Sequence, residues 1–236
     1  NRISVFDWDG EFLRSWGSHG KGPGEFDRPS GLLIQSETVL VVDTRNHRVQ
    51  IYTKDGRFLA QWGVQGSGEG ELRLPWGITD DNNGNIYIAD WGNDRIQKFT
   101  ADGQHLATFG ESGDGEGQLN RPADVAVDTE GNLYIADWGN QRLQVLDSEG
   151  RFLESKRGEA TDLNPWVWEY FDGVQDEKKA RESFVPIYDV DTDDPHEISA
   201  RIESFFWDPC AIILDDAGRV YALETCRHRF QVFERV

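Results

Sequence analysis

Asn93-Asp94-Arg95-Ile96-Gln97 is repeated, with small changes, at Asn46–Gln50 and at Asn140–Gln144. The arginines of successive copies are 47 residues apart, and weaker copies occur near the two ends of the sequence, at Arg2–Ser4 and Arg229–Gln231. A constant period of this length is typical of a protein built from repeated structural units. The fold is therefore best derived from a single period.

The period from Arg28 to Gly63 contains four short runs of apolar or alternating residues, separated by turn residues. These runs are Pro29–Ile34, Thr38–Asp43, Arg48–Tyr52 and Phe58–Gly63. Short β-rich runs joined by tight turns predict a four-stranded antiparallel meander. Because the next two periods keep the same order of runs, the sequence predicts an all-β protein, namely a β-propeller with four strands in each blade.

Three motifs recur in order through the repeated part: Gly-x-Gly-x-[Phe/Leu]-x-x-Pro, Asp-x-x-Gly-Asn-[Ile/Leu]-Tyr-Ile-Ala-Asp and Asn-x-Arg-[Ile/Leu]-Gln. They resemble the NHL repeat, and the whole chain resembles a bacterial-type NHL-repeat protein with an insert before its last blade. Residues 18–156 match in three full copies, residues 1–17 in half a copy and residues 207–236 in most of one. The resemblance implies a six-bladed propeller, but it names no single function because NHL propellers serve many.

The periods divide a single propeller domain into successive units. We expect residues 1–17 to form half a blade, 18–63, 64–110 and 111–156 three full blades, 157–206 an insert, and 207–236 the last blade. The first and last units cannot complete one another, because both contain the strand with the repeated arginine. Since a ring of blades removes exposed strand edges only when it closes, we expect about one and a half blades to be missing upstream, and six blades in the parent protein.

Two features that repeat are interpreted as architecture. The glycine-rich stretches Gly20–Gly24, Gly66–Gly70 and Gly113–Gly117 look like phosphate-binding loops, but no helix follows them to present its N-terminus to an anion. We interpret them as crossovers between blades, in which glycine supplies the positive φ that the path requires.

A carboxylate also precedes each repeated arginine by one loop. The pairs are Asp43 with Arg48, Asp90 with Arg95, Asp137 with Arg142, and Glu224 with Arg229. An acid and an arginine that flank a tight turn can pair and can satisfy backbone carbonyls. We therefore expect these pairs to hold a strand connection in place rather than to bind a ligand.

Positions that differ between periods are better candidates for specificity. After the repeated prolines stand Ser30, Trp76, Ala123 and Cys210, followed by Gly31, Gly77, Asp124 and Ala211. The loop between the second and third strands carries Thr44, Trp91, Trp138 and Thr225, and then His47, Asp94, Gln141 and His228. Both groups should open on the same propeller face, so Trp76, Trp91, Asp124 and Trp138 are the predicted ligand or partner surface. The alternative is that Trp91 and Trp138 pack against neighbouring loops.

The insert at 157–206 is acidic and partly helical by prediction. It contains 5 Lys and Arg against 13 Asp and Glu. Asn164-Pro165 is a helix-start signal, and apolar residues follow it at helical spacing, which predicts helices over about 165–181 and about 195–205. Four aromatic residues could anchor a protein interface: Trp166, Trp168, Tyr170 and Phe171. Because the insert replaces a glycine crossover, it should act as a lid, a docking element or a plug over that face.

Metal and thiol chemistry find little support in the sequence. The run Asp189–Asp194 lacks the glycine and the glutamate of a calcium-binding EF-hand loop. No cofactor is predicted, although Ca²⁺ or another divalent cation stays an open alternative. For Cys210 and Cys226 we favour two buried free thiols, over a disulfide and over a metal cluster with His228.

Charge narrows the range of partners. A net charge of −19 argues against nucleic acid and against docking on an anionic membrane, and no run of 18 apolar residues could span a bilayer. The sequence contains no Met, which indicates that it does not begin where its gene begins. Its N-terminus therefore predicts no compartment for this otherwise soluble-looking chain.

No nucleophile–base pair, metal-ligand set or cofactor motif stands out. We therefore favour a non-catalytic binding or scaffold propeller that contacts a protein partner, a second copy of itself or a small ligand through the loop face and the insert. The alternative is a lyase or hydrolase assisted by a divalent metal at the mouth of the central channel, with Asp124 as its acid. That alternative rests on similarity to propellers such as the peptide-amidating lyase and the gluconolactonase-like enzymes; RNA binding, as in some animal NHL proteins, is disfavoured by the charge.

Overall fold

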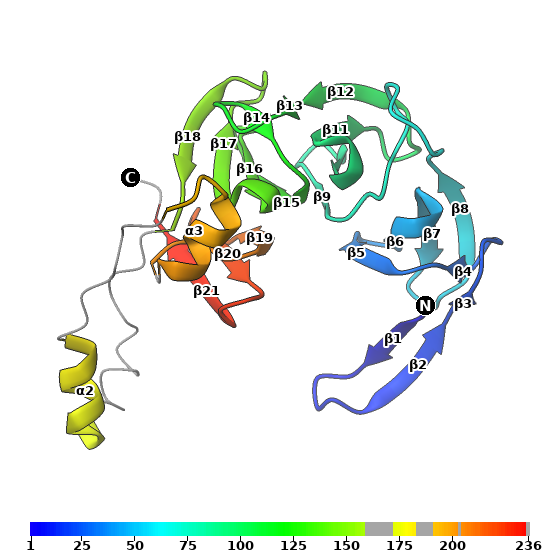
Figure 1. Ribbon diagram of the computed structural model, residues 1–236. Helices are drawn as coiled ribbons and strands as arrows, with labels where there is room; N and C mark the ends of the chain where they lie inside the picture. Colours follow the sequence, from blue (N-terminus) through cyan, green and yellow to red (C-terminus); the bar gives the residue numbers. More distant parts are fainter. Residues whose placement is uncertain (159–171, 183–190, 203, 235–236) are drawn as a thin grey trace.

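The computed structural model describes residues 1–158, 172–182, 191–202 and 204–234. Its sheets are small and antiparallel, and they stand side by side along an arc around a common centre (Figure 1). Of the antiparallel sheets, three have four strands, one has three, and the first has two; two short parallel pairs lie between sheets. The protein is therefore an all-β propeller, and the ribbon leaves the arc open between the first and last sheets (Figure 1).

Within each sheet the strands are hydrogen-bonded in chain order, from the inner edge of the arc to the outer edge. The first sheet pairs β1 (Ile3–Phe6) with β2 (Phe12–Trp16). The four-stranded sheets contain β5 (Pro29–Ile34), β6 (Thr38–Asp43), β7 (Arg48–Thr53) and β8 (Phe58–Trp62); β9 (Ile78–Asp80), β10 (Ile86–Asp90), β11 (Arg95–Phe99) and β12 (His105–Phe109); and β15 (Pro122–Val127), β16 (Leu133–Asp137), β17 (Arg142–Leu146) and β18 (Phe152–Lys156). The last sheet contains β19 (Pro209–Leu214), β20 (Val220–Glu224) and β21 (Arg229–Phe233).

One end of the sheets carries all the longer connections, and we call this end the loop face. Short 3-10 helices join the second and third strands there: η1 (Thr44–Asn46), η2 (Trp91–Asn93) and η3 (Trp138–Asn140). The glycine-rich crossovers between sheets reach the same end and form two short parallel pairs, β3 (Ser18–His19) with β4 (Glu25–Phe26), and β13 (Glu111–Ser112) with β14 (Gln118–Leu119). The two loop families of the sequence analysis therefore open on one face.

The hydrophobic core is divided into layers, each lying between two consecutive sheets. Alternating strand residues supply them: Tyr87 and Ile96 from one sheet pack against Val125 and Leu133 from the next. Each layer is closed by one fully buried residue three positions before the repeated proline, and these residues are Phe26, Leu72, Leu119 and Phe206. Phe206 thus restores the repeat at the end of the insert, so the chain enters the last sheet as it enters the others.

Consecutive sheets are also joined by one hydrogen bond at equivalent positions. The residue after each 3-10 helix has positive φ, and its side chain accepts a hydrogen bond from the backbone N–H of the residue before the next repeated proline. The bonds run from Leu74 to His47 Nδ1 (2.9 Å), from Arg121 to Asp94 Oδ1 (2.7 Å) and from Asp208 to Gln141 Oε1 (2.7 Å). His47, Asp94 and Gln141, which vary between periods and were candidates for specificity, therefore hold neighbouring blades together.

The insert contributes two helices within the described residues. Helix α2 (Gln175–Glu182) lies apart from the sheets in Figure 1, and α3 (Pro195–Arg201) lies over the loop face. Asp194 caps α3 by accepting from the backbone N–H of His196 at 2.8 Å, and the helix ends at Arg201, earlier than the predicted end at about 205. The predicted start at Asn164-Pro165 and the aromatic residues Trp166, Trp168, Tyr170 and Phe171 lie outside the described residues. No helix in the described ranges is long and apolar enough to cross a membrane.

Candidate ligand-binding site on the loop face

The repeated arginines are fully engaged by the scaffold. Arg48 Nε donates to Asp43 Oδ2 at 2.9 Å, and its terminal nitrogens donate to the carbonyl oxygens of Lys21, Gly22 and Glu25 at 2.8, 2.8 and 2.9 Å. In the same way, Arg95 pairs with Asp90 and Arg142 with Asp137, and each arginine also donates to a carbonyl oxygen of its own crossover. Arg229 pairs with Glu224 at 2.6 Å. Arg48, Arg95 and Arg142 thus hold the glycine-rich crossovers, and Arg229 holds the end of the insert through the carbonyl oxygens of Ser204 and Phe205, so we assign these cations to the scaffold.

The glycines of the crossovers serve two purposes. The last glycine of each stretch has positive φ, between 74° and 83°, as expected from the sequence: Gly24, Gly70 and Gly117. The middle glycine of each stretch does not have positive φ, so the explanation predicted from the sequence is wrong for these positions. At Gly22 an added Cβ would lie 3.1 Å from Glu25 Oε2, the oxygen that accepts a hydrogen bond from the Gly22 N–H at 2.8 Å. These positions are glycine because a side chain three residues later folds back onto the loop.

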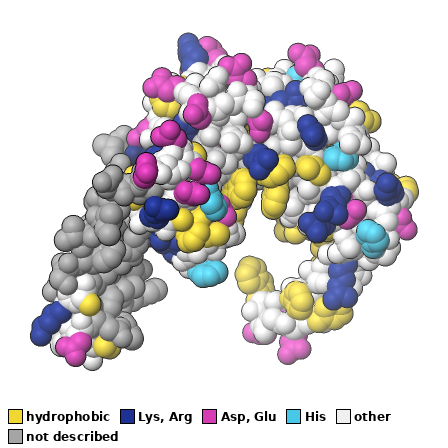
Figure 2. All heavy atoms as spheres, in the orientation of Figure 1, with side chains coloured by type: hydrophobic (Ala, Val, Ile, Leu, Met, Phe, Trp, Pro, Cys, Tyr) yellow, Lys and Arg dark blue, Asp and Glu magenta, His cyan; other side chains and the backbone are white. Residues whose placement is uncertain are grey.

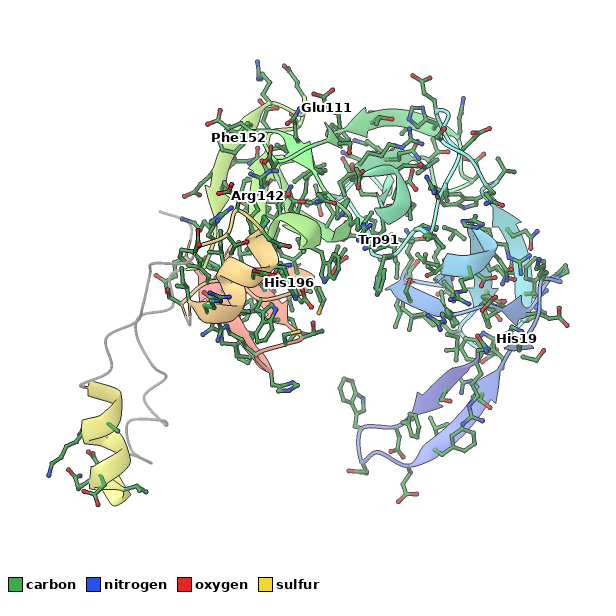
Figure 3. All side chains as sticks on the ribbon, in the orientation of Figure 1. His19, Trp91, Glu111, Arg142, Phe152 and His196 are labelled. Carbon is green, nitrogen blue, oxygen red and sulfur yellow. The ribbon has the colours of Figure 1, made fainter. Side chains whose placement is uncertain are left out.

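Three tryptophans from two neighbouring blades form a continuous row of rings on the loop face, which we call the tryptophan ridge (Trp76, Trp91 and Trp138). The Trp76 and Trp91 ring centroids are 6.0 Å apart, and those of Trp91 and Trp138 are 6.2 Å apart. Trp91 and Trp138 begin the helices η2 and η3, and Trp91 lies near the inner edge of the arc (Figure 3). The rings contact one another, yet Trp76 remains 43% exposed and the other two are partly exposed.

A groove lies on each side of the tryptophan ridge. The first groove has a volume of about 390 Å³ and is lined by Arg28, Pro29, Ser30, Thr44, Arg45, Leu74, Trp76 and Trp91. The second groove has a volume of about 590 Å³ and is lined by Asn120, Arg121, Trp138, Gly139, Gln141, Asp194, Pro195 and His196. Helix α3 of the insert forms one wall of the second groove, so the insert adds to this face.

His196 is held in place on that wall by two neighbours. Its Nδ1 lies 3.2 Å from Asp208 Oδ1, and its Nε2 accepts a hydrogen bond from Trp207 Nε1 at 3.2 Å. The Trp207 contact therefore places the proton of the neutral ring on Nδ1. Figure 3 shows His196 on α3.

A third cavity, of about 450 Å³, lies along the inner strands β5, β9, β15 and β19. Asp124 and Cys210 are its titratable lining residues. Asp124 accepts hydrogen bonds from the backbone N–H of Ile212 and of Val125, each at 3.0 Å, while burial raises the pKa of Asp124 to about 7. Burial and the nearby Asp124 also raise the pKa of the Cys210 thiol, which disfavours the reactive thiolate.

The described residues bring no set of metal ligands together. In the described ranges, no group of three or more His, Cys, Asp and Glu side chains is placed to hold a metal ion. Both cysteines are free thiols, but the expectation that both are buried is wrong: Cys226 is exposed because it lies in the turn after β20, and Cys210 is only partly buried. Its Sγ lies 3.1 Å from Asp208 Oδ2, and His228 is exposed in the same turn.

Sequence reasoning missed the arginines of the two grooves, Arg28, Arg45 and Arg121. Arg28 and Arg121 stand directly before repeated prolines, where the other blades carry Leu74 and Asp208. The residue before the repeated proline therefore differs between blades, and this variation is the sequence signal for Arg28 and Arg121.

Comparison with known proteins supports the fold. A family model described as the NHL repeat matches residues 119–146, and one described as a 6-bladed β-propeller matches residues 27–109. The RING finger protein nhl-1 of Caenorhabditis elegans is 54% identical over 88 residues, which is 37% of this chain and 9% of that protein. The chain therefore spans only a small part of this curated relative.

Solved structures agree with the family models. Virginiamycin B lyase from Staphylococcus aureus matches with a TM-score of 0.56 and 15% identity over 99% of this chain and 63% of that chain. A protein of unknown function from Bacteroides thetaiotaomicron matches with a TM-score of 0.60 and 18% identity over 95% of this chain and 50% of that chain. At these identities the likeness concerns the fold alone. With the repeats matched in its sequence, these findings support an NHL-repeat β-propeller.

Proposed function

We propose that this protein is a non-catalytic binding propeller, and that a segment of a partner protein lies along the tryptophan ridge between the two grooves. The ridge carries the proposal, because the repeat does not require aromatic residues there. The equivalent positions in other blades hold Ser30, Ala123 and Cys210, or Thr44 and Thr225. Three partly exposed indoles in mutual contact are costly to leave in water and are typical of an interface anchor.

The shape of the site favours an extended segment over a compact small molecule. Two centroid steps of 6.0 and 6.2 Å along the ridge correspond to about four residues of extended chain at ~3.3 Å per residue. The grooves on both sides lengthen this track, and α3 borders one of them. The insert therefore belongs to the proposed interface.

The catalytic alternative receives less support from the described residues. The lining of the inner-strand cavity offers Asp124 as its one carboxylate within the described part of the chain. Both oxygens of that carboxylate already accept backbone hydrogen bonds. Similarity to virginiamycin B lyase at 15% identity adds the fold and no residue roles.

The proposal is tested by selecting binders from a displayed library of random peptides of about twelve residues, a length that covers the ridge and both grooves. Selected peptides should bind the full chain and lose affinity about tenfold or more on Trp91→Ala, since central aromatic anchors dominate such interfaces. Leu153→Ala is the matched control, because Leu153 is 53% exposed on the outer strand β18. A failure to select any binder, or binders that tolerate Trp91→Ala and Leu153→Ala equally, would contradict the proposal.

A further inference from the structure

Building on the proposed binding face, we infer that its partner segment is acidic, with carboxylates that pair with Arg28, Arg45 and Arg121 on either side of the tryptophan ridge. The inference starts from a local reversal of charge. The chain carries 43 Asp and Glu against 24 Lys and Arg, yet the first groove is lined by two arginines and, within the described residues, by no acid. Figure 2 shows Lys and Arg side chains beside the apolar ones at the inner part of the arc, and acidic side chains mainly toward the rim and α3.

These three arginines differ from six other arginines of the chain in having no ion pair among the described residues. Ion pairs engage Arg48, Arg95, Arg142, Arg151, Arg219 and Arg229. Within the described residues, no carboxylate and no hydrogen-bond acceptor engages the guanidinium groups of Arg28, Arg45 and Arg121, and all three residues are exposed. In a chain with such an excess of acids, arginines without an ion pair on both sides of one aromatic ridge are a place where an external anion would be favoured.

Arg121 shows how charge and aromatic surface combine. Its guanidinium carbon lies 5.0 Å from the centroid of the Trp91 ring, so the cation is held against the ridge by a cation–π contact. A guanidinium held on its face still presents its N–H edge, which matches the two oxygens of a carboxylate. A ligand that places apolar groups on the indoles and carboxylates beside them would use both features.

A protein segment fits this arrangement better than a nucleic acid. A nucleic-acid strand carries one negative phosphate per nucleotide, and a chain with a net charge of −19 repels these phosphates. Three arginines can neutralise only a few of them. Asp194 also lines the second groove and would repel a continuous polyanion. A peptide can place a few carboxylates at the arginines and apolar residues between them, which keeps the attraction and avoids the repulsion.

The charge of selected peptides gives the first test. Peptides of about twelve residues from the displayed random library should be enriched in Asp and Glu relative to the unselected library. Exchange of Glu for Gln in the best peptide should weaken binding about tenfold, and only the acidic form should weaken further as salt rises from about 0.05 M to about 0.5 M. Neutral or basic binders that depend on Trp91 would overturn this inference and leave the proposed binding face standing.

Charge reversal on the protein gives the second test. Arg28→Glu combined with Arg121→Glu should weaken the acidic peptide about tenfold or more and leave the Gln form nearly unchanged. Lys54→Glu combined with Arg57→Glu is the matched control, because it changes the net charge by the same amount and both residues are exposed in the turn between β7 and β8, at the opposite end of the sheet. Equal losses in both variants would point to net charge rather than to this site. A labelled uridine oligonucleotide that binds the wild-type chain more tightly than the acidic peptide would also overturn the inference.

Discussion

Replacement of Arg142 by Met tests whether the repeated arginines hold neighbouring blades together. Arg142 Nε donates to Asp137 Oδ2 at 2.8 Å, and its terminal nitrogens donate to the carbonyl oxygens of Asp114, Gly115 and Gln118 at 2.7, 2.9 and 2.9 Å. Asp137 is completely buried and Arg142 is nearly so. Methionine keeps most of the apolar stem and removes every one of these hydrogen bonds.

The expected loss in the free energy of unfolding is about 3–5 kcal/mol at neutral pH, the usual effect of removing one partner of a buried ion pair. The crossover carbonyls can recover water because the loop is partly exposed, whereas the Asp137 carboxylate stays buried without a countercharge. Burial already raises the pKa of Asp137, and loss of Arg142 should raise it further. A raised pKa in the folded state costs stability as the pH rises through it, so the deficit of the variant should shrink between pH 7 and about pH 5.

Urea denaturation followed by far-UV circular dichroism at both pH values measures this deficit. Arg151→Met is the matched control: Arg151 pairs with Asp147 at 2.6 Å, but the pair is exposed and its removal should change little. Adding Asp137→Asn to Arg142→Met should recover part of the loss, since no buried charge is then left unpaired. An Arg142→Met effect no larger than that of Arg151→Met, or a deficit that grows at lower pH, would refute the reasoning.

Two further predictions concern the inner strands. Because the pKa of Asp124 is raised from 3.8 to about 7, the stability of the wild-type chain should fall as the pH rises between these values, and Asp124→Asn should lose less over that range when melting temperatures are compared. Gly77→Ala should destabilise the chain by about 1–3 kcal/mol in urea denaturation, because the new Cβ would lie 2.7 Å from Asp124 Cα and 2.8 Å from the Ala123 carbonyl oxygen. Gly68→Ala should cost less, since its Cβ would meet the mobile carboxylate of Glu71 at 3.1 Å; equal losses in the two variants would show that strand approach does not decide the effect.

The strands and their order were predictable because the period fixes them several times over. Thr38–Asp43 was predicted as a strand and is β6, and the run at Arg48 is β7. Each copy of the repeat supplies the same alternation and the same turn residues, so an error in one copy is corrected by the next. The position of the tryptophans on one face followed from the same reasoning, since antiparallel connections must alternate between the two ends of a sheet.

The sequence did not reveal what the variable side chains do. His47, Asp94 and Gln141 have little in common as residue types, but each can accept one hydrogen bond, and each accepts it from the next blade. A role that depends only on an acceptor atom at a fixed place leaves no pattern in residue identity. The exposure of Cys226 was missed for a related reason, because the small residues of a turn give no sign of which side they face.

Variation between repeats is therefore not by itself a mark of function. The position of Asp124 differs between blades, but its carboxylate accepts a hydrogen bond from the backbone N–H of Ile212. This bond joins the inner strands β15 and β19, which the insert separates in the sequence. The stronger criterion is variation together with exposure and with bonding capacity that the fold leaves unused. The tryptophan ridge meets the first two conditions, and Arg28, Arg45 and Arg121 meet all three. Because these arginines line the grooves that border the tryptophan ridge, the hydrogen-bonding capacity that the fold leaves unused lies beside the exposed aromatic surface, where one partner segment could use both.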